Sequence, residues 1–217
     1  MDGVVLSGSN NVFLVLCADG SRRSCGLKGK RLKGSGAYNA LAAGDNVEVI
    51  PDPSDPAKGQ IGSLLPRRNV FGRFNEKGRA RQAIAANVDQ VVCVSSPAYP
   101  PFRPRFVDRV AVLAEAAGVP LLIALNKADL GIPEDTLRRL GDYEALGYSV
   151  LIVSAETGRG IEELNAAIAG KTSVFTGQSG VGKSTLLNLL SPGLLLRTGE
   201  VSEKYARGKH TTTMAEL

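Results

Sequence analysis

A glycine-rich segment near the end of the chain has the residue types that bind phosphate. Residues 177–184 read GQSGVGKS and satisfy the pattern G-x-x-x-x-G-K-[ST]. Glycines let successive backbone N–H groups converge on an anion, and the helix expected to follow presents the positive end of its dipole to the same phosphates. Lys183 is expected to reach the β- and γ-phosphates of a nucleotide, and Ser184 is expected to ligate Mg²⁺. The expected binding residues are Gly177, Gln178, Ser179, Gly180, Val181, Gly182, Lys183, Ser184 and Thr185.

A second polar motif, NKAD at 126–129, directly follows the apolar run 121–125. A carboxylate at the end of a buried strand can accept two hydrogen bonds from N1–H and the exocyclic amine of guanine, and adenine offers no such pair of donors. Asp129 is therefore expected to select the base, with the stem of Lys127 along the base face and Ala128 beside it. Asn126 would either bond the edge of the ring or tie neighbouring loops together.

A third motif, SAETG at 154–158, follows another apolar run. Backbone N–H groups around Ala155 could meet the carbonyl of guanine, and Ser154 is counted with this site. The alternative is a purely structural one, in which Ser154 or Thr157 caps a helix. The spacing of this motif after NKAD favours the nucleotide interpretation.

The elements that must position these motifs can be read from the hydrophobic pattern. Short runs that are apolar on both faces predict buried parallel strands, and amphipathic stripes between them predict helices. The strands are expected at 91–94, 121–125, 150–153 and 173–175. The helices are expected at 106–117, 133–146 and 161–168, with another after the phosphate loop. This alternation predicts an open, doubly wound α/β domain over residues 84–217.

The first 66 residues have a different sequence pattern, in which short β-like runs are separated by turn residues. Five such runs predict a small all-β barrel, with the OB-fold as the first candidate. The runs lie at 4–7, 11–17, 21–25, 45–50 and 60–65. Residues 67–83 are expected to be a basic linker between this barrel and the α/β domain.

The formal net charge is +5, and the basic residues are clustered. Residues 21–43 contain no acid, and residues 66–82 contain Glu76 alone. Clustered Lys and Arg attract a nucleic-acid backbone and release its counterions, although an ordinary solvated surface is the alternative. The residues expected to bind RNA are Arg22, Arg23, Lys28, Lys30, Arg31 and Lys33. The second cluster comprises Arg67, Arg68, Arg73, Lys77, Arg79 and Arg81.

Cysteine usage and hydropathy exclude several classes of protein. The three cysteines have no C-x-x-C spacing, which argues against a disulfide framework and a zinc knuckle. The longest apolar runs, such as 119–125, fall far short of the roughly 20 residues that cross a bilayer. We therefore expect a cytoplasmic protein without a membrane partner.

The motifs NKAD, SAETG and GQSGVGKST are those of GTPases, but the base-reading motifs precede the phosphate loop. With the barrel in front and the late segment KHTTT at 209–213, the chain resembles the circularly permuted GTPases that act in small ribosomal subunit biogenesis. The resemblance implies a P-loop GTPase domain with a mostly parallel sheet, preceded by an OB-fold barrel. It also implies hydrolysis of GTP to GDP with Mg²⁺, and binding to the small ribosomal subunit and its 16S rRNA as a monomer.

The same resemblance assigns roles to residues after the phosphate loop. It makes this stretch the first switch region, in which one threonine supplies oxygen to the metal; Thr212 or Thr213 is favoured. It also makes His210, the single histidine, the residue that positions the attacking water, beside Lys183 as the second catalytic group.

The chain departs from the family in two respects. It contains no D-x-x-G motif and no counterpart of the family's C-terminal zinc-binding domain. We therefore expect part of a longer protein, weak hydrolysis, and an exposed sheet edge at 173–175. Two other functions stay open: a non-catalytic RNA-binding module gated by guanine nucleotide, and an ATP-using P-loop enzyme if NKAD is incidental.

Overall fold

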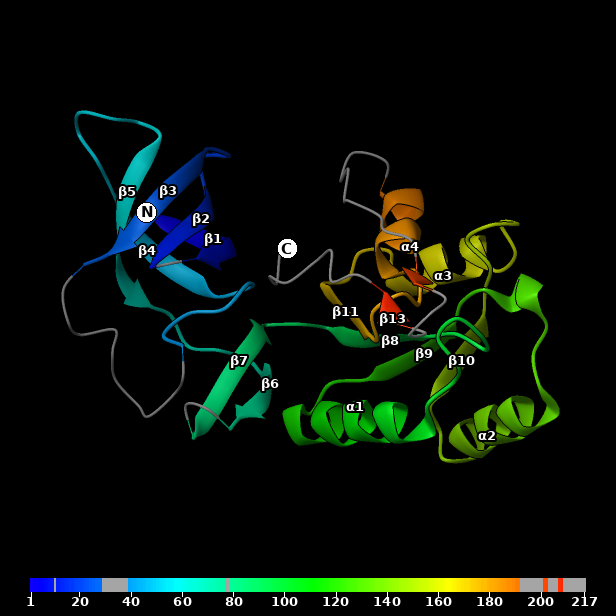
Figure 1. Ribbon diagram of the computed structural model, residues 1–217. Helices are drawn as coiled ribbons and strands as arrows, with labels where there is room; N and C mark the ends of the chain where they lie inside the picture. The colour runs from blue at the N-terminus through cyan, green and yellow to red at the C-terminus, as the bar shows by residue number, and fades with distance from the viewer. Residues whose placement is uncertain (10, 29–38, 77–78, 192–200, 203–206, 209–217) are drawn as a thin grey trace. The chain divides into compact units, whose positions relative to one another are not determined.

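The chain divides into two compact units, Met1–Val88 and Asp89–Thr213. Figure 1 shows the structure, a computed structural model that describes residues 1–9, 11–28, 39–76, 79–191, 201–202 and 207–208. None of the helices in these ranges is both long and apolar enough to cross a membrane.

The first unit contains a closed barrel with the strand order β1-β2-β3-β5-β4. Its strands are β1 (Asp2–Ser9), β2 (Val12–Cys17), β3 (Arg22–Leu27), β4 (Asn46–Pro51) and β5 (Lys58–Leu64). β3 and β5 pair in parallel, and the other neighbours are antiparallel. Alternate residues such as Val5, Val15 and Val47 point inward and are buried, as the period of two predicts. The five-stranded barrel expected from the sequence is confirmed.

A β-hairpin follows the barrel, in the stretch where a linker was expected. β6 (Val70–Asn75) pairs antiparallel with β7 (Ala80–Ala86). Side-chain amides hold β7 to the segment before β4. Asn39 accepts the Ala83 N–H and donates to the Ala83 carbonyl, each at 2.9 Å. Asn87 donates to the Gly44 carbonyl at 2.8 Å. The hairpin therefore belongs to the first unit.

A buried ion pair reinforces this attachment. The Arg67 guanidinium contacts Asp45 through two of its three nitrogens, with Nε–Oδ1 at 2.6 Å and Nη2–Oδ2 at 2.7 Å. The Asp45 carboxylate is fully buried and also accepts the Ala42 N–H at 2.8 Å. Such bidentate, charge-assisted pairing fixes both distance and direction. It orients the chain as it leaves the barrel for the hairpin.

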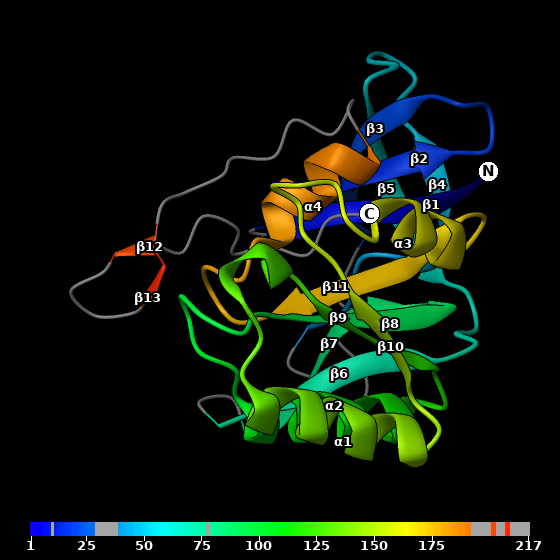
Figure 2. The same ribbon diagram turned by 90° about the vertical axis from the view of Figure 1, so that its right-hand side faces the viewer.

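The second unit is built on a parallel sheet in the order β10-β9-β8-β11. The strands are β8 (Gln90–Ser95), β9 (Leu121–Leu125), β10 (Ser149–Ile152) and β11 (Ser173–Gly177). The helices are α1 (Pro104–Ala117), α2 (Glu134–Ala145), α3 (Ile161–Ile168) and α4 (Lys183–Leu190). Figure 2 shows α1 and α2 on one face of the sheet and α3 and α4 on the other. The predicted α/β fold is confirmed.

The hydrophobic pattern explains this layered arrangement. β8 and β9 are completely buried because helices cover both faces of the sheet. Leu164 of α3 and Leu186 of α4 share one core with Val92, Val94 and Ala124. Among the described strands β11 pairs with β8 alone, so it lies at the sheet edge, as expected. A short two-residue ladder joins β12 (Val201–Ser202) and β13 (Arg207–Gly208).

Candidate guanine-nucleotide site

The three motifs meet at one edge of the parallel sheet. NKAD follows β9, SAETG follows β10, and the phosphate loop follows β11. Because these strands are parallel, their carboxyl ends lie at the same edge, which is where open α/β sheets bind ligands. The whole arrangement lies within the second unit (Figure 1).

Asn126 joins all three motifs. Its side chain is buried, with 1% of its surface exposed. Nδ2 donates to the Val181 carbonyl in the phosphate loop at 2.9 Å, and Oδ1 accepts the Ala155 N–H at 3.0 Å. Its own backbone N–H donates to the Ser95 carbonyl at 2.8 Å. Of the two roles open from the sequence, Asn126 therefore has the second: it ties the loops together.

At two glycines of the phosphate loop, the structure leaves no room for a side chain. A Cβ on Gly182 would lie 2.3 Å from Asn126 Nδ2, and the Gly182 φ of +92° is itself unfavourable for other residues. A Cβ on Gly177 would lie 2.3 Å from the Val94 carbonyl oxygen. Because these two residues lack a side chain, the backbone of the loop can pack directly against Asn126 and against β8.

Lys183 begins α4, and its ammonium lies inside the phosphate loop. Nζ donates to the carbonyls of Gly177 and Gln178 at 2.9 and 2.8 Å. Burial lowers the pKa of Lys183 because water no longer stabilises the charged form. An incoming phosphate would supply the negative charge that these neutral carbonyls lack. Ser179, Gly180 and Thr185 complete the loop and the first turn of the helix.

The oxygen atoms of the site suit Mg²⁺ that is bound together with a nucleotide. The described residues contain no group of three His, Cys, Asp or Glu that could hold a metal ion alone. Mg²⁺ is commonly bound by one or two protein oxygens together with substrate phosphates and water. Ser184, next to Lys183 in the first turn of α4, would supply such an oxygen.

Asp129 is held by the third motif. The buried Ser154 hydroxyl donates to Asp129 Oδ1 and accepts the Thr157 N–H at 3.2 Å. Ser154 therefore caps its own turn and also orients the carboxylate. Within the described part of the chain, Oδ2 of Asp129 accepts no hydrogen bond, so it is available to a base. Ala128, directly before it, donates its N–H to the Val153 carbonyl at 3.1 Å.

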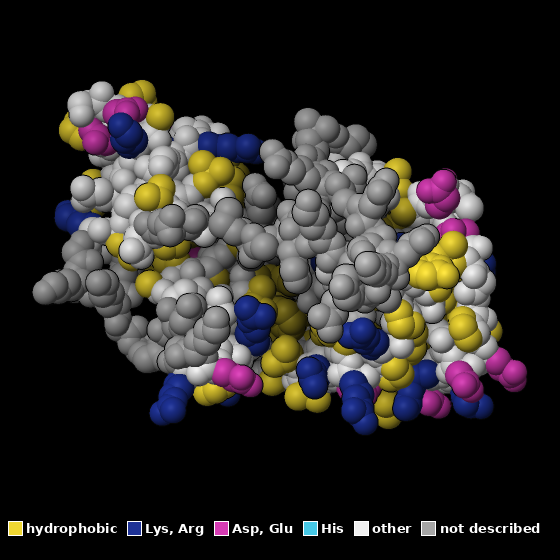
Figure 3. All heavy atoms as spheres, in the orientation of Figure 1, with side chains coloured by type: hydrophobic (Ala, Val, Ile, Leu, Met, Phe, Trp, Pro, Cys, Tyr) yellow, Lys and Arg dark blue, Asp and Glu magenta, His cyan; other side chains and the backbone are white. Residues whose placement is uncertain are grey.

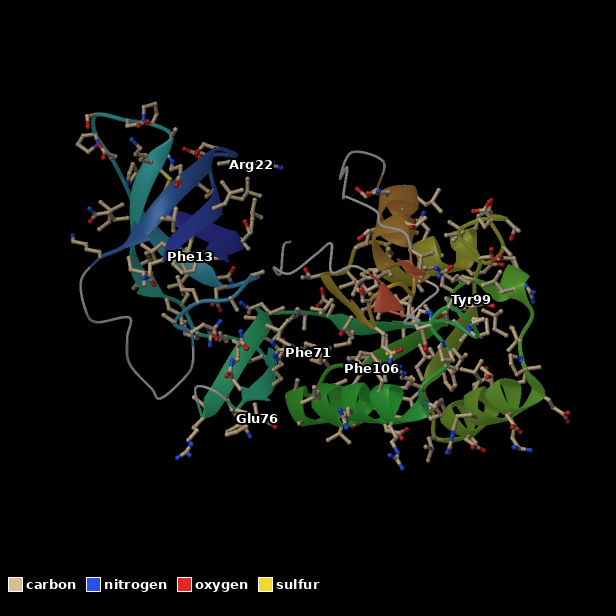
Figure 4. All side chains as sticks on the ribbon, viewed as in Figure 1. Phe13, Arg22, Phe71, Glu76, Tyr99 and Phe106 are labelled. Carbon is tan, nitrogen blue, oxygen red and sulfur yellow. The ribbon has the colours of Figure 1, made fainter. Side chains whose placement is uncertain are left out.

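Lys127 has a partner that the sequence did not predict. Its backbone is left-handed, with φ of 63°, and Nζ donates to the Tyr99 carbonyl at 2.6 Å. Burial lowers the pKa of Lys127, while the charge of Asp129 acts in the opposite direction. Ser96 Oγ fixes the same loop by donating to the Pro100 carbonyl at 2.8 Å. Figure 4 shows Tyr99 in the loop after β8; its side chain is 60% exposed. In the sequence, the adjacent prolines at 100 and 101 were the signal that could have indicated an ordered loop at this position.

The residues expected to bind RNA fall into three groups. Arg22 and Lys28 are exposed on and just after β3, and Figure 4 shows Arg22 projecting from the barrel. Arg23 is 8% exposed: its guanidinium donates to the Pro56 carbonyl at 2.8 Å and to Asp19 at 3.1 Å. These internal contacts remove Arg23 from any RNA surface. Lys30, Arg31 and Lys33 lie outside the described residues, as do His210, Thr212 and Thr213.

Comparison with known proteins agrees with this geometry. The family model described as RsgA GTPase matches residues 64–217. The curated protein "Small ribosomal subunit biogenesis GTPase RsgA" of Porphyromonas gingivalis is 39% identical over all of this chain and 70% of its own length. Its namesake from Chlorobaculum parvum is 41% identical over all of this chain and 72% of its own length.

Two solved structures share the fold. YjeQ from Thermotoga maritima matches with a TM-score of 0.68 at 37% identity, and YloQ, titled a circularly permuted GTPase, matches with 0.62 at 28%. Each comparison covers 90% of this chain and 66% of the solved chain, so this chain spans slightly less than two thirds of their length. From the motifs, the site geometry and these matches together, the chain belongs to the RsgA GTPase family.

Proposed function

We propose that the chain binds GTP at the edge of the parallel sheet and hydrolyses it to GDP and phosphate. We propose further that its nucleotide state controls binding to the small ribosomal subunit during maturation. The observation that carries the proposal is the position of Asn126, whose amide joins the phosphate loop at Val181 to the base-reading loop at Ala155. Phosphate binding and base selection are thereby parts of one site.

Guanine selection rests on Asp129. Ser154 holds one carboxylate oxygen, and the other is available to accept hydrogen bonds from N1–H and the amine of guanine. Adenine presents no matching donors, so binding it would leave a charged acceptor unpaired. The stem of Lys127, held by the Tyr99 carbonyl, would lie along the base. This argues against the ATP-using alternative.

Hydrolysis requires charge stabilisation around the γ-phosphate. Lys183 would exchange its two carbonyl partners for phosphate oxygens, and a cation there offsets the charge of the transition state. Ser184 would hold Mg²⁺, with Thr212 or Thr213 as a further ligand, and the metal would neutralise phosphate charge. His210 would position the attacking water.

Binding to the subunit is proposed to use basic residues of the first unit on 16S rRNA. Support comes from exposed Arg22 and Lys28 on the barrel, to which we add Lys30, Arg31 and Lys33 from the sequence. The hairpin contributes exposed Arg73, Arg79 and Arg81, together with Phe74, which is 64% exposed. Cations that track a backbone beside an aromatic ring suit RNA. We propose a monomer acting in the cytoplasm.

Single-turnover hydrolysis of radiolabelled GTP, with and without purified small ribosomal subunits, tests the activity. We expect a slow intrinsic rate that rises when subunits are added, and we expect His210→Ala to lower turnover while GTP affinity stays within about twofold. A rate equal to uncatalysed hydrolysis under both conditions would contradict the enzymatic proposal. Unlabelled ATP should fail to displace labelled GDP.

A second candidate function is an RNA-binding module gated by guanine nucleotide without catalysis. The observation that favours it is the exposed basic surface of the first unit, which includes Arg22, Lys28 and Arg73 and needs no hydrolysis to bind RNA. It would bind GTP and GDP with different effects on RNA affinity, yet hydrolyse no GTP. The single-turnover experiment therefore separates the two functions directly.

A further inference from the structure

A group of exposed arginines lies at the start of α1. Arg103 precedes the helix, Arg105 lies in its first turn, and Arg109 lies one turn later; all three are exposed. Figure 3 shows dark-blue side chains along the side of the second unit where α1 lies. Among the residues that the structure describes, none of the three forms an ion pair. We call these residues the α1 arginine surface.

These three positions are electrostatically unfavourable within the chain itself. The positive end of the helix dipole repels cations at the N-terminus of α1, whose first turn contains no acidic residue. Arg105 and Arg109 are four residues apart, so their like charges lie on the same helix face. The nearest helical acid, Asp108, already accepts the Tyr143 hydroxyl at 2.7 Å. Folding alone therefore gives no reason for the placement of the three arginines.

The arginines of helix α2, in contrast, form ion pairs. Arg138 pairs with Asp135, and Arg139 pairs with Asp142 at 3.3 Å. Both pairs are exposed and follow the i, i+3 spacing that balances charge on a helix surface. The same layer of the unit thus contains one helix whose basic residues are neutralised and one whose basic residues are not. The difference identifies α1, and not the layer as a whole, as a surface for an external anion.

We propose that the α1 arginine surface binds the phosphate backbone of RNA, giving the nucleotide-binding unit its own contact with the small ribosomal subunit. This rests on the proposed function and extends it, because the RNA residues considered above all lie in the first unit. Guanidinium groups bind phosphate bidentately and remain charged at all relevant pH values. A contact on the unit that binds nucleotide would let GTP and RNA act on the same folded body.

The test compares variants that remove arginines from α1 and from α2, and the double variant Arg103→Gln/Arg105→Gln removes the same charge as the α2 variant. Arg103→Gln/Arg105→Gln/Arg109→Gln removes the α1 arginine surface, and Arg138→Gln/Arg139→Gln removes two paired arginines from α2. Binding of each to purified small subunits and to naked 16S rRNA is measured over a series of KCl concentrations. GDP affinity and the thermal midpoint are measured in parallel, to separate an effect on RNA binding from an effect on the nucleotide site or on folding.

For the α1 variant we expect weaker RNA binding and a plot of log K against log salt that is shallower by about two, since each lost phosphate contact removes roughly 0.7–0.9 from the slope. We expect unchanged GDP affinity and an unchanged or higher thermal midpoint. The α2 variant should bind RNA as the unmodified chain does. If the triple variant folds poorly, Arg103→Gln/Arg105→Gln should still lower the slope.

An unchanged slope in the α1 variant would overturn the proposal and favour an acidic protein as the partner of this surface. Equal losses in the α1 and α2 variants would also overturn it, because the effect would then be one of net charge. Failure of the unmodified chain to bind subunits would contradict the proposed function, while the comparison on naked rRNA would still test the α1 arginine surface. Failure to bind either RNA would contradict both.

Discussion

Asn126 illustrates how one buried amide can organise a binding site. Its Nδ2 donates to the loop after β11 and its Oδ1 accepts from the loop after β10, so one side chain joins loops that follow different strands. The close approach of Gly182 to Nδ2 leaves no room for a side chain between them. A buried polar group with both functions satisfied is rigid as well as stable, so the phosphate loop is positioned before a ligand arrives.

At Asp129, replacement by Asn should remove the selectivity for guanine. The Asn amide has one neutral oxygen that accepts a hydrogen bond, and its NH₂ group would point at an N–H group of guanine, donor against donor. The pair of charge-assisted hydrogen bonds to guanine is therefore lost. We expect GDP affinity to fall by on the order of 100-fold or more, and xanthosine diphosphate to bind better than GDP. Fluorescent-nucleotide titration measures both, with Asp135→Asn on α2 as the control. GDP binding at normal affinity would contradict the assigned role.

Substitution of Gly182 by Ala should damage the phosphate loop itself. The added Cβ would lie 2.3 Å from Asn126 Nδ2 at a φ of +92°, so we expect a loss of about 1–3 kcal/mol in the free energy of unfolding. Nucleotide binding should fall in parallel, because Asn126 must move. Gly141→Ala is the matched control: nothing lies within 4 Å of its added Cβ, and it should stabilise α2 by up to about 1 kcal/mol. Urea titration compares the two variants, and equal effects would disprove the explanation.

At the scale of elements, the β6–β7 hairpin is fixed by polar contacts as well as by buried apolar side chains such as Phe71. The side chains of Asn39 and Asn87 add hydrogen bonds to the backbone bridge between β7 and the segment before β4. The Asp45–Arg67 pair adds a buried charge contact. The basic side chains Arg73, Arg79 and Arg81 of the hairpin are exposed, which is why we propose the hairpin as part of the RNA surface.

The ion pair between Asp45 and Arg67 predicts strong non-additivity. Arg67→Met leaves the buried carboxylate unpaired, and we expect a loss of about 3–5 kcal/mol in the free energy of unfolding. Asp45→Asn combined with Arg67→Met should recover most of it, because no buried charge remains. Arg139→Met, which breaks an exposed pair, should cost about 1 kcal/mol or less. Chemical denaturation of the unmodified chain, Asp45→Asn, Arg67→Met and the double variant gives the coupling energy, with Arg139→Met as a separate control. A coupling energy near zero would refute a stabilising role for the pair.

At the scale of the whole molecule, the described nucleotide-site residues all lie in the second unit. Nucleotide binding stabilises only what folds together with the site, by about 2.7 kcal/mol at a ligand concentration of 100 Kd. GDP should therefore slow amide hydrogen exchange in β8, β9 and β11 and leave the barrel strands unchanged. Mass spectrometry of peptides from each unit measures this. Equal added protection in β1–β5 would mean that the two units unfold as one.

The sequence by itself determined the barrel, the parallel sheet with its helices and the permuted motif order, and it predicted which residue would select guanine. These follow from local periodicity and from spacing within a few residues, which a linear pattern records directly. Only the tertiary structure decided what Asn126 bonds, why Arg23 is internal and that a hairpin fills the expected linker. Those facts depend on contacts between residues far apart in sequence, such as the 55 positions from Asn126 to Val181 and the 44 from Asn39 to Ala83. A side chain's type states which hydrogen bonds it can make, but the folded chain alone brings a particular partner within reach.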